Sequence, residues 1–505
     1  MKTILMKKVG VLMFVLGLFS AETEAQNALV NNQGAGIYIM PGATVIIKQD
    51  SLHNYNGLIQ NGGDFIIEGK VVNDDSLTGF PSSSTGLYKV QGDWANNGTV
   101  LSYQDTVHLY GNNQLITGSE ITPFHHLLLT GGAGVVKTQT IDATVDGNLN
   151  LTDVELATEA NEMLVLNTSV GAIEKTNGPD GFVSSIANGK LTRATNLNSS
   201  YFYPLGTPSS LGGTFYYRPL DYTPVDNQAN QYSARLVADP LADGYDPAIM
   251  DDKLCKVNPL FYHELKHKIG NSATDIKVYF ESADGNWTDI AQWENTNLWA
   301  YTSQGYTGVF GTMNTVEIKN WNDFATYPFA LASKKFTVNA GPDKNLSPGQ
   351  SVVLNSTNTA AGTPQIEWTP DLFLDNAYAE DPKTTPTESM VYVIKVTDNN
   401  GCELRDTVKV NLLGNILLVP TAFSPNKDGV NDFFRPLNRN IKALNFQVYN
   451  RWGEKVYETS RLDEGWDGFF RGTAQEMGVY VWKAEYQLEN QTSKQYIQGN
   501  VTLLR

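Results

Sequence analysis

Two histidines four residues apart, in His263-Glu264-Leu265-Lys266-His267, form the pattern with the clearest catalytic potential in this chain. On a helix, residues four apart share one face, so both imidazoles could bind one zinc ion while the glutamate activates water. From Phe261 to Ile269, however, the apolar residues and the histidines occupy every second position, and this period of two predicts a half-buried strand. On a strand the histidines stand ~13 Å apart, at ~3.3 Å per residue, too far to share a metal. The sequence therefore predicts no zinc site, no peptidase and no catalytic residue here.

A second candidate is the set of side-chain oxygens on Asn426, Asp428 and Asp432, which are spaced around Gly429. This spacing partly matches a calcium loop, but the leading Asp and the closing bidentate Glu of the helix-flanked loop are missing. The alternative is a loop held by its own Asn and Asp side chains. We favour that alternative and expect no cofactor, with calcium as the one candidate.

Three tryptophans, Trp287, Trp293 and Trp299, recur at intervals of six residues. They could form a platform on which sugars stack, or they could be buried in a core, and burial is the more frequent role of such residues. The sequence contains no G-x-S-x-G nucleophile motif, no phosphate-binding loop and no paired-cysteine metal site. Paired carboxylates stay open, because the chain has 53 acidic residues.

The composition predicts strands and turns in a secreted chain. Charged residues make up 18% of the 505 residues and there are 44 glycines, a composition that favours strands and turns over long helices. A net charge of −17 argues against nucleic acid as a partner. A basic start, an apolar run over 9–19 and small residues at 23 and 25 predict a signal peptide over 1–25, cleaved between Ala25 and Gln26. No other run is long enough to span a membrane. Cys255 and Cys402 fall in different predicted domains, so we expect no disulfide.

Residues 26–200 repeat short β-prone runs at intervals of about 15 to 30 residues, separated by Gly and Asn. Repeats this short must stack to bury a face, which predicts a β-helix-like solenoid. A large antiparallel sandwich is the alternative. The clearest runs are Ile37-Tyr38-Ile39, Val45-Ile46-Ile47, Phe65-Ile66-Ile67, Val107-His108-Leu109, Leu127-Leu128-Leu129 and Leu164-Val165-Leu166.

Two further domains follow. Aromatic runs broken by proline, then alternating strands, predict a β-sandwich over 201–335. Residues 336–413 contain Asn339-Ala340-Gly341-Pro342-Asp343, a strand tryptophan at Trp368 and the run VYVIKVTDNNGC. This unit resembles a PKD domain, and the resemblance implies an immunoglobulin-like sandwich that acts as a spacer.

Residues 415–505 combine short β-prone runs with ordered sequence blocks. The residues of these blocks are Ser424, Pro425, Asn426, Asp428, Gly429, Asn431, Asp432, Asn450, Arg451, Trp452, Gly453, Trp466, Asp467, Gly468, Gly478 and Tyr480. With them the segment resembles the gliding-motility-associated C-terminal domain, which is the type B sorting domain of type IX secretion in Bacteroidota. The resemblance implies recognition by the type IX machinery after signal-peptide-dependent export to the periplasm.

The sequence thus predicts an all-β, multidomain, secreted protein: a solenoid, β-sandwich domains of PKD or immunoglobulin type, and a C-terminal β-sandwich sorting domain. We expect a non-enzymatic, adhesin-like protein on the outer cell surface, associated with gliding or attachment. Its partners would be the type IX machinery and surface glycans or extracellular matrix. The alternative is an extracellular polysaccharide-acting enzyme or a carbohydrate-binding protein.

Overall fold

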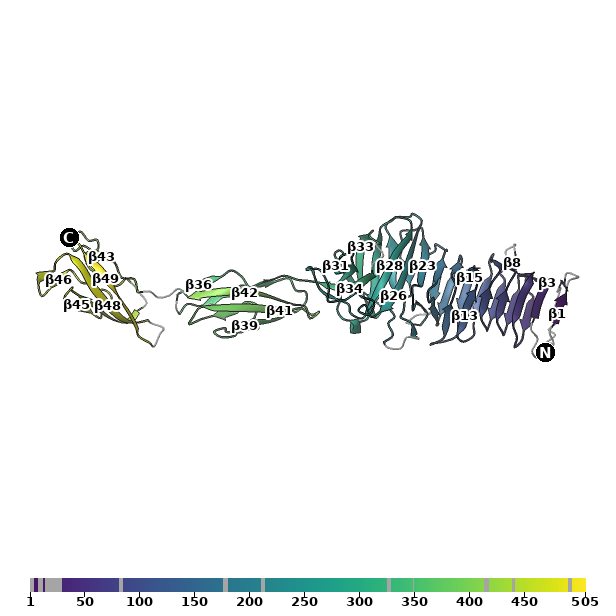
Figure 1. Ribbon diagram of the computed structural model, residues 1–505, viewed down its shortest axis with the longest axis horizontal. Helices are drawn as coiled ribbons and strands as arrows, with labels where there is room; N and C mark the ends of the chain where they lie inside the picture. Colours follow the sequence, from purple (N-terminus) through teal and green to yellow (C-terminus); the bar gives the residue numbers. More distant parts are fainter. Residues whose placement is uncertain are drawn as a thin grey trace. The chain divides into compact units, whose positions relative to one another are not determined.

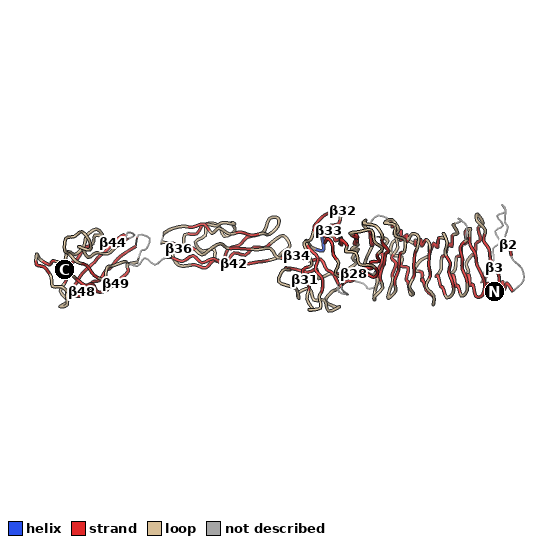
Figure 2. Tube along the Cα trace, turned by 90° about the horizontal axis from the view of Figure 1, so that it is seen from above, coloured by secondary structure: helices blue, strands red, loops and turns tan. Residues whose placement is uncertain are grey.

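Short β-strands make up nearly all of the regular structure, and the short 3-10 helix η2 (Ser282–Asp284) is an exception (Figure 2). The structure, a computed structural model, describes residues 4–7, 12–13, 30–80, 85–175, 180–209, 214–324, 328–347, 349–412, 417–437, 441–488 and 493–505. The chain divides into two compact units, residues 1–335 and 336–505. The predicted all-β class is confirmed.

The first unit begins with a solenoid of stacked parallel strands (Figure 1). Paired strands follow one another at intervals of about 20 residues. For example, Trp94 pairs with Val71 on one side and with Ile116 on the other, at offsets of 23 and 22 residues. The predicted runs coincide with parallel strands of this array, except that Leu166 lies just after its strand, so the solenoid is confirmed and the antiparallel alternative is wrong here. One sheet contains β1 (Ile4–Lys7), β2 (Leu12–Met13), β3 (Val30–Ile39), β5 (Leu52–Asn61), β7 (Val71–Asn73), β8 (Ser76–Gly79), β10 (Trp94–Asn96), β11 (Thr99–Leu101), β13 (Gln114–Gly118), β16 (Val136–Gln139), β19 (Glu155–Ala157) and β22 (Phe182–Ser184). A second contains β4 (Thr44–Ile47), β6 (Asp64–Ile67), β9 (Leu87–Val90), β12 (Thr106–Leu109), β15 (His126–Leu129), β18 (Leu149–Thr152) and β21 (Ile173–Lys175).

A ladder of buried asparagines runs through four successive turns of the solenoid. Asn32, Asn54, Asn73 and Asn96 are fully buried, and the side-chain amide of each of the first three donates to Oδ1 of the next at 2.9 Å. The ladder satisfies polar groups that burial would otherwise make costly.

The third sheet starts in the solenoid and continues into the sandwich. Its first four strands are parallel, and from the pairing of β23 with β26 onward the order is antiparallel. One hydrophobic core extends from Ile39 to Leu331, so residues on both sides of position 200 share it. The strands are β14 (Thr122–Phe124), β17 (Ala143–Val145), β20 (Glu162–Val165), β23 (Lys190–Thr195), β26 (Asn230–Ala238), β28 (Phe261–Ile269), β34 (Pro328–Lys334), β30 (Asp289–Trp293) and β31 (Trp299–Tyr301), with β27 (Leu254–Val257) beside β34.

A five-stranded antiparallel sheet completes the sandwich. Its order is β24 (Tyr201–Tyr203), β25 (Leu220–Pro224), β29 (Thr274–Phe280), β33 (Met313–Trp321) and β32 (Tyr306–Phe310). Residues of this sheet, among them Tyr222, Ile276 and Val316, belong to the same core as Phe261 and Leu265 of β28. The sandwich therefore shares its main core with the solenoid, and a smaller cluster around Trp293 and Trp299 lies on the other face of β28.

The second unit holds two hydrophobic cores. The core of residues 336–412 surrounds Trp368 and Tyr392. Its strands are β36 (Lys344–Leu346), β42 (Glu403–Leu412), β41 (Met390–Thr397) and β39 (Gln365–Thr369) in one sheet, with the pairs β35 (Val338–Asn339)–β38 (Thr357–Asn358) and β37 (Val352–Val353)–β40 (Lys383–Thr384).

The core of residues 417–505 surrounds Phe446 and Trp466. Its main sheet has the order β43 (Ala422–Phe423), β49 (Gln495–Leu503), β48 (Gly478–Leu488), β44 (Ile441–Tyr449) and β45 (Lys455–Thr459), with the hairpin β46 (Phe469–Phe470)–β47 (Thr473–Ala474).

Both cysteines, Cys255 and Cys402, are disulfide-bonded, and neither is a free thiol. The prediction of no disulfide is therefore wrong. It rested on the placement of the two residues in different predicted domains, and that placement does not decide whether a cysteine is oxidised. Disulfides persist in oxidising compartments, which agrees with an exported chain.

Candidate functional site in the C-terminal domain

The loop after β43 is closed by its own side chains. Both carboxylate oxygens of Asp432 accept backbone N–H groups, from Lys427 at 2.6 Å and from Gly429 at 2.9 Å. Asp428 accepts from the amide of Val430 at 2.7 Å, and Asn426 accepts from the amide of Asp428 at 3.0 Å. The bonds to Asn426 and Asp428 form Asx-type turns, in which a short polar side chain bonds the amide two residues on.

The same hydrogen bonds bear on the calcium candidates Asn426, Asp428 and Asp432. The Val430 amide and the Asn426 side chain hold the pKa of Asp428 below its usual value. The side chains of the loop thus hold it together by themselves, and calcium stays an untested candidate ligand. Ser424 donates its backbone N–H to the carbonyl of Asn431 at 3.0 Å, which joins the two ends of the loop.

Trp466 anchors the centre of the domain. It is fully buried, exchanges backbone hydrogen bonds with Phe434, and lies 4.7 Å from the ring of Tyr480. Its indole N–H donates to the carbonyl of Phe469 at 2.9 Å. Trp466 is therefore a core residue of the domain.

The residues next to Trp466 form a turn that contacts the first loop. Asp467 accepts from the amide of Phe469 at 3.0 Å. Gly468 has φ 78°, and a Cβ on it would stand 3.0 Å from Pro425. Glycine thus provides the turn and the close approach of two predicted blocks.

Trp452 has the opposite environment, although it belongs to the same set of matching residues. It lies in the turn between β44 and β45 and is 82% exposed. The side chain of Asn450 builds this turn by accepting from the amides of Trp452 and Glu454, both at 3.0 Å, and Gly453 adopts φ 78°. The turn therefore presents an indole to solvent.

A groove of about 480 Å³ joins this turn to the segment before β48. Arg451 forms an ion pair with Glu476 and stands 5.7 Å from the Trp452 ring. Tyr480 donates its hydroxyl to the carbonyl of Glu476 at 2.8 Å. The lining residues are Asn450, Arg451, Trp452, Thr473, Ala474, Gln475, Glu476, Met477, Gly478, Val479 and Tyr480. The structure thus brings the blocks at 450–453 and 478–480 together on one surface.

The histidine pair lies on the strand β28, as the alternation predicts. His263 is buried and donates to the carbonyl of Arg218 at 2.8 Å, and burial lowers its pKa to about 4. His267 donates to Oδ1 of Asn230 at 2.9 Å, and desolvation lowers its pKa too. Among the described residues no cluster of three or more metal-ligating side chains occurs.

Tyr262 corrects one detail of that prediction. It falls on the side of β28 expected to be polar, yet it is 1% exposed. Tyr262 packs in a second cluster with Trp293 and Trp299, because other strands of the sandwich cover that face. Trp287 is buried as well, so these tryptophans offer no exposed sugar platform.

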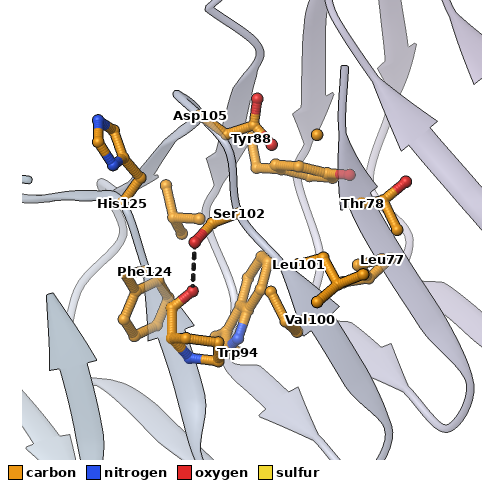
Figure 3. A pocket seen from close by; sticks show the side chains of 13 residues that line it. Leu77, Thr78, Tyr88, Trp94, Val100, Leu101, Ser102, Asp105, Phe124 and His125 are labelled. Atoms are coloured by element: carbon orange, nitrogen blue, oxygen red, sulfur yellow. Dashed lines mark hydrogen bonds between the residues drawn. The ribbon is translucent and has the colours of Figure 1, made fainter. Parts of the chain in front are cut away.

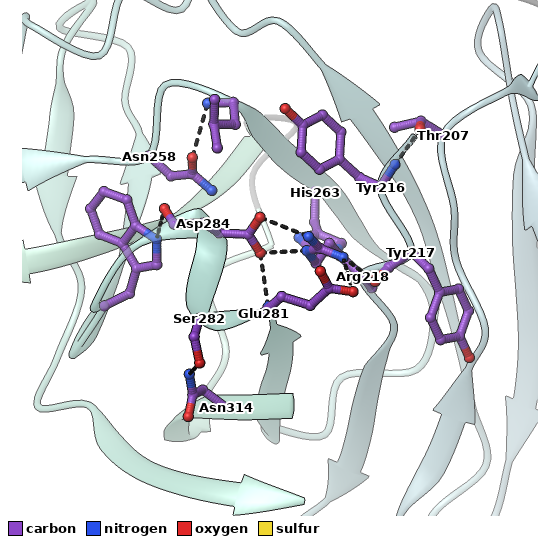
Figure 4. A network of polar contacts seen from close by, with 12 residues as sticks. Thr207, Tyr216, Tyr217, Arg218, Asn258, His263, Glu281, Ser282, Asp284 and Asn314 are labelled. Carbon is purple, nitrogen blue, oxygen red and sulfur yellow. Dashed lines mark hydrogen bonds and ion pairs between the residues drawn. The ribbon is translucent and has the colours of Figure 1, made fainter. Parts of the chain in front are cut away.

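A polar network surrounds His263 (Figure 4). The buried guanidinium of Arg218 pairs with Asp284 through contacts of 2.5 and 2.7 Å. Glu281, 3.3 Å from Arg218, is 55% exposed at its side chain. The network fastens η2 to the strands, and its partners are satisfied by one another.

The solenoid contains a small cavity of about 20 Å³ (Figure 3). It lies between Tyr88, Trp94, Asp105 and Phe124, a size suited to about one water molecule. The Tyr88 hydroxyl is buried and has no protein partner. Burial raises the pKa of Asp105 to about 6.

The predicted cleavage site at Ala25 and Gln26 lies outside the described residues. No described helix has the length and hydropathy that a membrane-crossing helix needs.

Comparison with known proteins identifies the C-terminal domain. Residues 417–499 match the CHU_C type IX secretion signal domain. No curated protein sequence matches the chain. Two solved structures show low similarity, at TM-scores that support no argument about fold or function. Dimeric latent PorU from Porphyromonas gingivalis has 9% identity and a TM-score of 0.14, over 57% of this chain and 32% of that chain. A tetra-tandem repeat in the extending region of a large adhesion protein has 13% identity and a TM-score of 0.15, over 61% and 93%.

This chain therefore spans about a third of the length of the PorU chain. The match at 417–499 confirms the type IX sorting domain. This domain indicates that the chain is a type IX secretion substrate, recognised by that machinery and exported to the cell surface or the extracellular space.

Proposed function

We propose that this protein is a non-enzymatic, adhesin-like protein displayed on the outer surface of a Bacteroidota cell. The observation that carries the proposal is the secretion signal domain at 417–499, because an export address at the end of a modular β chain fits display. The solenoid adds support, because buried side chains fill its interior, among them the hydrogen-bonded asparagine ladder. Attachment or gliding is the process we assign to it, with surface glycans or extracellular matrix as partners.

The other segments take supporting roles in this proposal. Residues 1–25 are a signal peptide, residues 26–200 and 201–335 form the displayed solenoid and sandwich, and residues 415–505 are the type B sorting domain. Residues 336–413 are a PKD-like spacer with a core of their own. In that spacer Asp406 accepts the amide of Ala340 at 2.8 Å and Asp343 accepts that of Lys409 at 2.9 Å. These bonds fix the first loop to the sheet, as a rigid spacer requires.

Within the sorting domain we assign recognition by the export machinery to the surface around Trp452. An indole that is 82% exposed does little for the core, and exposed tryptophan and arginine are typical of binding hot spots. Met477 and Val479, 65% and 58% exposed, extend the apolar part of this surface along the groove. Trp466, Gly468 and Asp432 have folding roles instead.

The test is export in a cell with an intact type IX system. A chain without residues 415–505 should accumulate in the periplasm, and a reporter fused to those residues should reach the surface. Surface labelling with fractionation measures both. Normal display of the truncated chain would refute the assignment of the address. For the adhesive role, residues 26–413 are screened on glycan arrays and matrix proteins and with polysaccharide substrates. Hydrolysis of any substrate would overturn the non-enzymatic role.

A further inference from the structure

The strand β32 (Tyr306–Phe310) is an open sheet edge with unusual composition. It pairs with β33 on one side and ends its sheet, so in the described part of the chain its other side has no strand partner. All five residues are exposed, with Tyr306 at 54%, Val309 at 73% and Phe310 at 69%. None of them carries a charge.

Two other sheet edges in the described part of the chain are protected. The edge strand β45 carries Lys455 and Glu458, which form an ion pair, and charged side chains on an edge discourage pairing with another chain. The edge strand β31 is covered, since Trp299 is fully buried and Ala300 is 9% exposed. The edge at β32 has neither protection, so it is able to accept a further strand.

The sequence of β32 is self-complementary in an antiparallel arrangement. If two copies pair about a two-fold axis at Gly308, Tyr306 of each faces Phe310 of the other, and Thr307 faces Val309. Aromatic pairs and pairs of β-branched residues are the favourable cross-strand combinations. The ring of Tyr279 stands 5.7 Å from that of Phe310 and helps to fix its position.

The charges nearby allow this pairing. Glu317 on β33 is the register partner of Tyr306. Its carboxylate forms ion pairs with Lys319 at 2.9 Å and Lys277 at 3.6 Å. The carboxylate next to the edge is therefore paired with two lysines, which reduces its repulsion of the same group in a second copy.

We propose that β32 is a homotypic contact site, at which two copies of the protein pair their β32 edges antiparallel about Gly308. A two-fold contact of this kind closes after two chains and forms no fibre. The five-residue strand gives a small interface, so the dimer is weak in solution. Dense display on a surface raises the effective concentration and favours the pairing.

The first experiment is sedimentation equilibrium of the purified chain. We expect a monomer–dimer equilibrium that Val309→Lys weakens about tenfold, since the change disturbs two symmetry-related pairs and each is worth up to about 1 kcal/mol. Leu241→Lys is the matched control, because Leu241 is 62% exposed on a loop of the same sandwich. It should leave the equilibrium unchanged.

The second experiment tests the register. Because neither native cysteine is a free thiol, cysteines introduced at Thr307 and Val309 are the reactive ones. A mixture of Thr307→Cys and Val309→Cys chains should form disulfide-linked dimers under mild oxidation, well above the level given by either variant alone.

Two sedimentation results would overturn the proposal. The first is a monomer at every concentration up to about 1 mM, which would make the free energy of dimerisation weaker than about −4 kcal/mol. The second is a dimer that Val309→Lys leaves intact. Equal cross-linking in the mixture and in each single-cysteine variant would also overturn it. So would open-ended oligomers, or a β32 edge that pairs with a different protein and never with a second copy.

Discussion

The side-chain amide of Asn54 donates a 2.9 Å hydrogen bond to Oδ1 of Asn73, one turn further along the solenoid. The side-chain amide of Asn73 in turn donates to Oδ1 of Asn96 at 2.9 Å and to the carbonyl of Thr99 at 3.2 Å. Each residue is thus donor and acceptor at once, and only an amide side chain supplies both in this geometry.

Replacing Asn73 by aspartate should destabilise the solenoid. The change keeps the shape of the side chain but places a carboxylate oxygen against Oδ1 of Asn96 and the carbonyl of Thr99, which both accept. We therefore expect the free energy of unfolding to fall by about 3 kcal/mol. Urea unfolding followed by circular dichroism measures the effect. Asn112→Asp, at an exposed position, is the control and should change stability by less than about 0.5 kcal/mol. Equal effects of the two changes would contradict the role of the ladder.

Alanine substitutions of Trp452 and Trp466 should have different effects, the first on export and the second on folding of the C-terminal domain. Trp466→Ala empties a fully buried site and should cost the C-terminal domain about 3–5 kcal/mol. Trp452→Ala should leave unfolding almost unchanged and still reduce surface display. Thermal unfolding and surface labelling on the same two variants distinguish them. Full display of Trp452→Ala would remove this surface from the export contact.

The histidine pair should bind no stoichiometric zinc. Its two Nε2 atoms are engaged with different partners, the Arg218 carbonyl and the Asn230 side chain, and the strand separates them by ~13 Å. Metal analysis after exhaustive dialysis is the measurement, with the double variant His263→Ala, His267→Ala as comparison. One zinc per chain that the double variant loses, together with peptidase activity, would reverse the interpretation.

Asp105 should give stability an unusual pH dependence. Its folded-state pKa of about 6 lies above its ordinary value of 3.8, so its stabilising effect is complete below pH 3.8 and is lost as the pH rises through 6. His263 acts in the opposite sense, because its pKa of about 4 lies below 6.5 and its contribution is lost as the pH falls between these values.

Asp105→Asn therefore isolates the first effect. Relative to the unchanged chain, its free energy of unfolding should rise between pH 4 and pH 7, by on the order of 3 kcal/mol. Denaturant titrations at both pH values measure this difference. A constant difference across the range would mean that Asp105 titrates normally in the folded chain.

The exported protein should contain no free thiol. The chain has two cysteines, both disulfide-bonded, so thiol titration in denaturant should give none per chain, and two after reduction. Chain expressed in a reducing compartment is the comparison and should show both thiols. Free thiols in the exported protein would contradict the structure.

Local patterns predicted the features that depend on local spacing. The alternation from Phe261 to Ile269 identifies a strand, and the short apolar runs identify the solenoid, because both signals are contained in a few residues. The burial of Tyr262 could not be predicted, since it depends on strands distant in sequence that cover the second face of β28.

The asparagine ladder and the two tryptophans illustrate the same limit. The ladder residues are 22, 19 and 23 positions apart, and irregular loops between the turns hide the repeat. Trp452 and Trp466 both precede turn glycines or lie next to them, yet one is exposed and one is buried. Only the three-dimensional fold distinguishes a contact residue from a core residue.

The sheet that passes from the solenoid into the sandwich has a consequence for self-assembly. Parallel solenoids end in strand edges on which further turns could stack, and such ends need caps. Here β26 pairs antiparallel with β23, so the sandwich acts as a terminator that blocks end-to-end stacking at this end of the solenoid. A chain cut near position 200 would lose that terminator and expose a growing end.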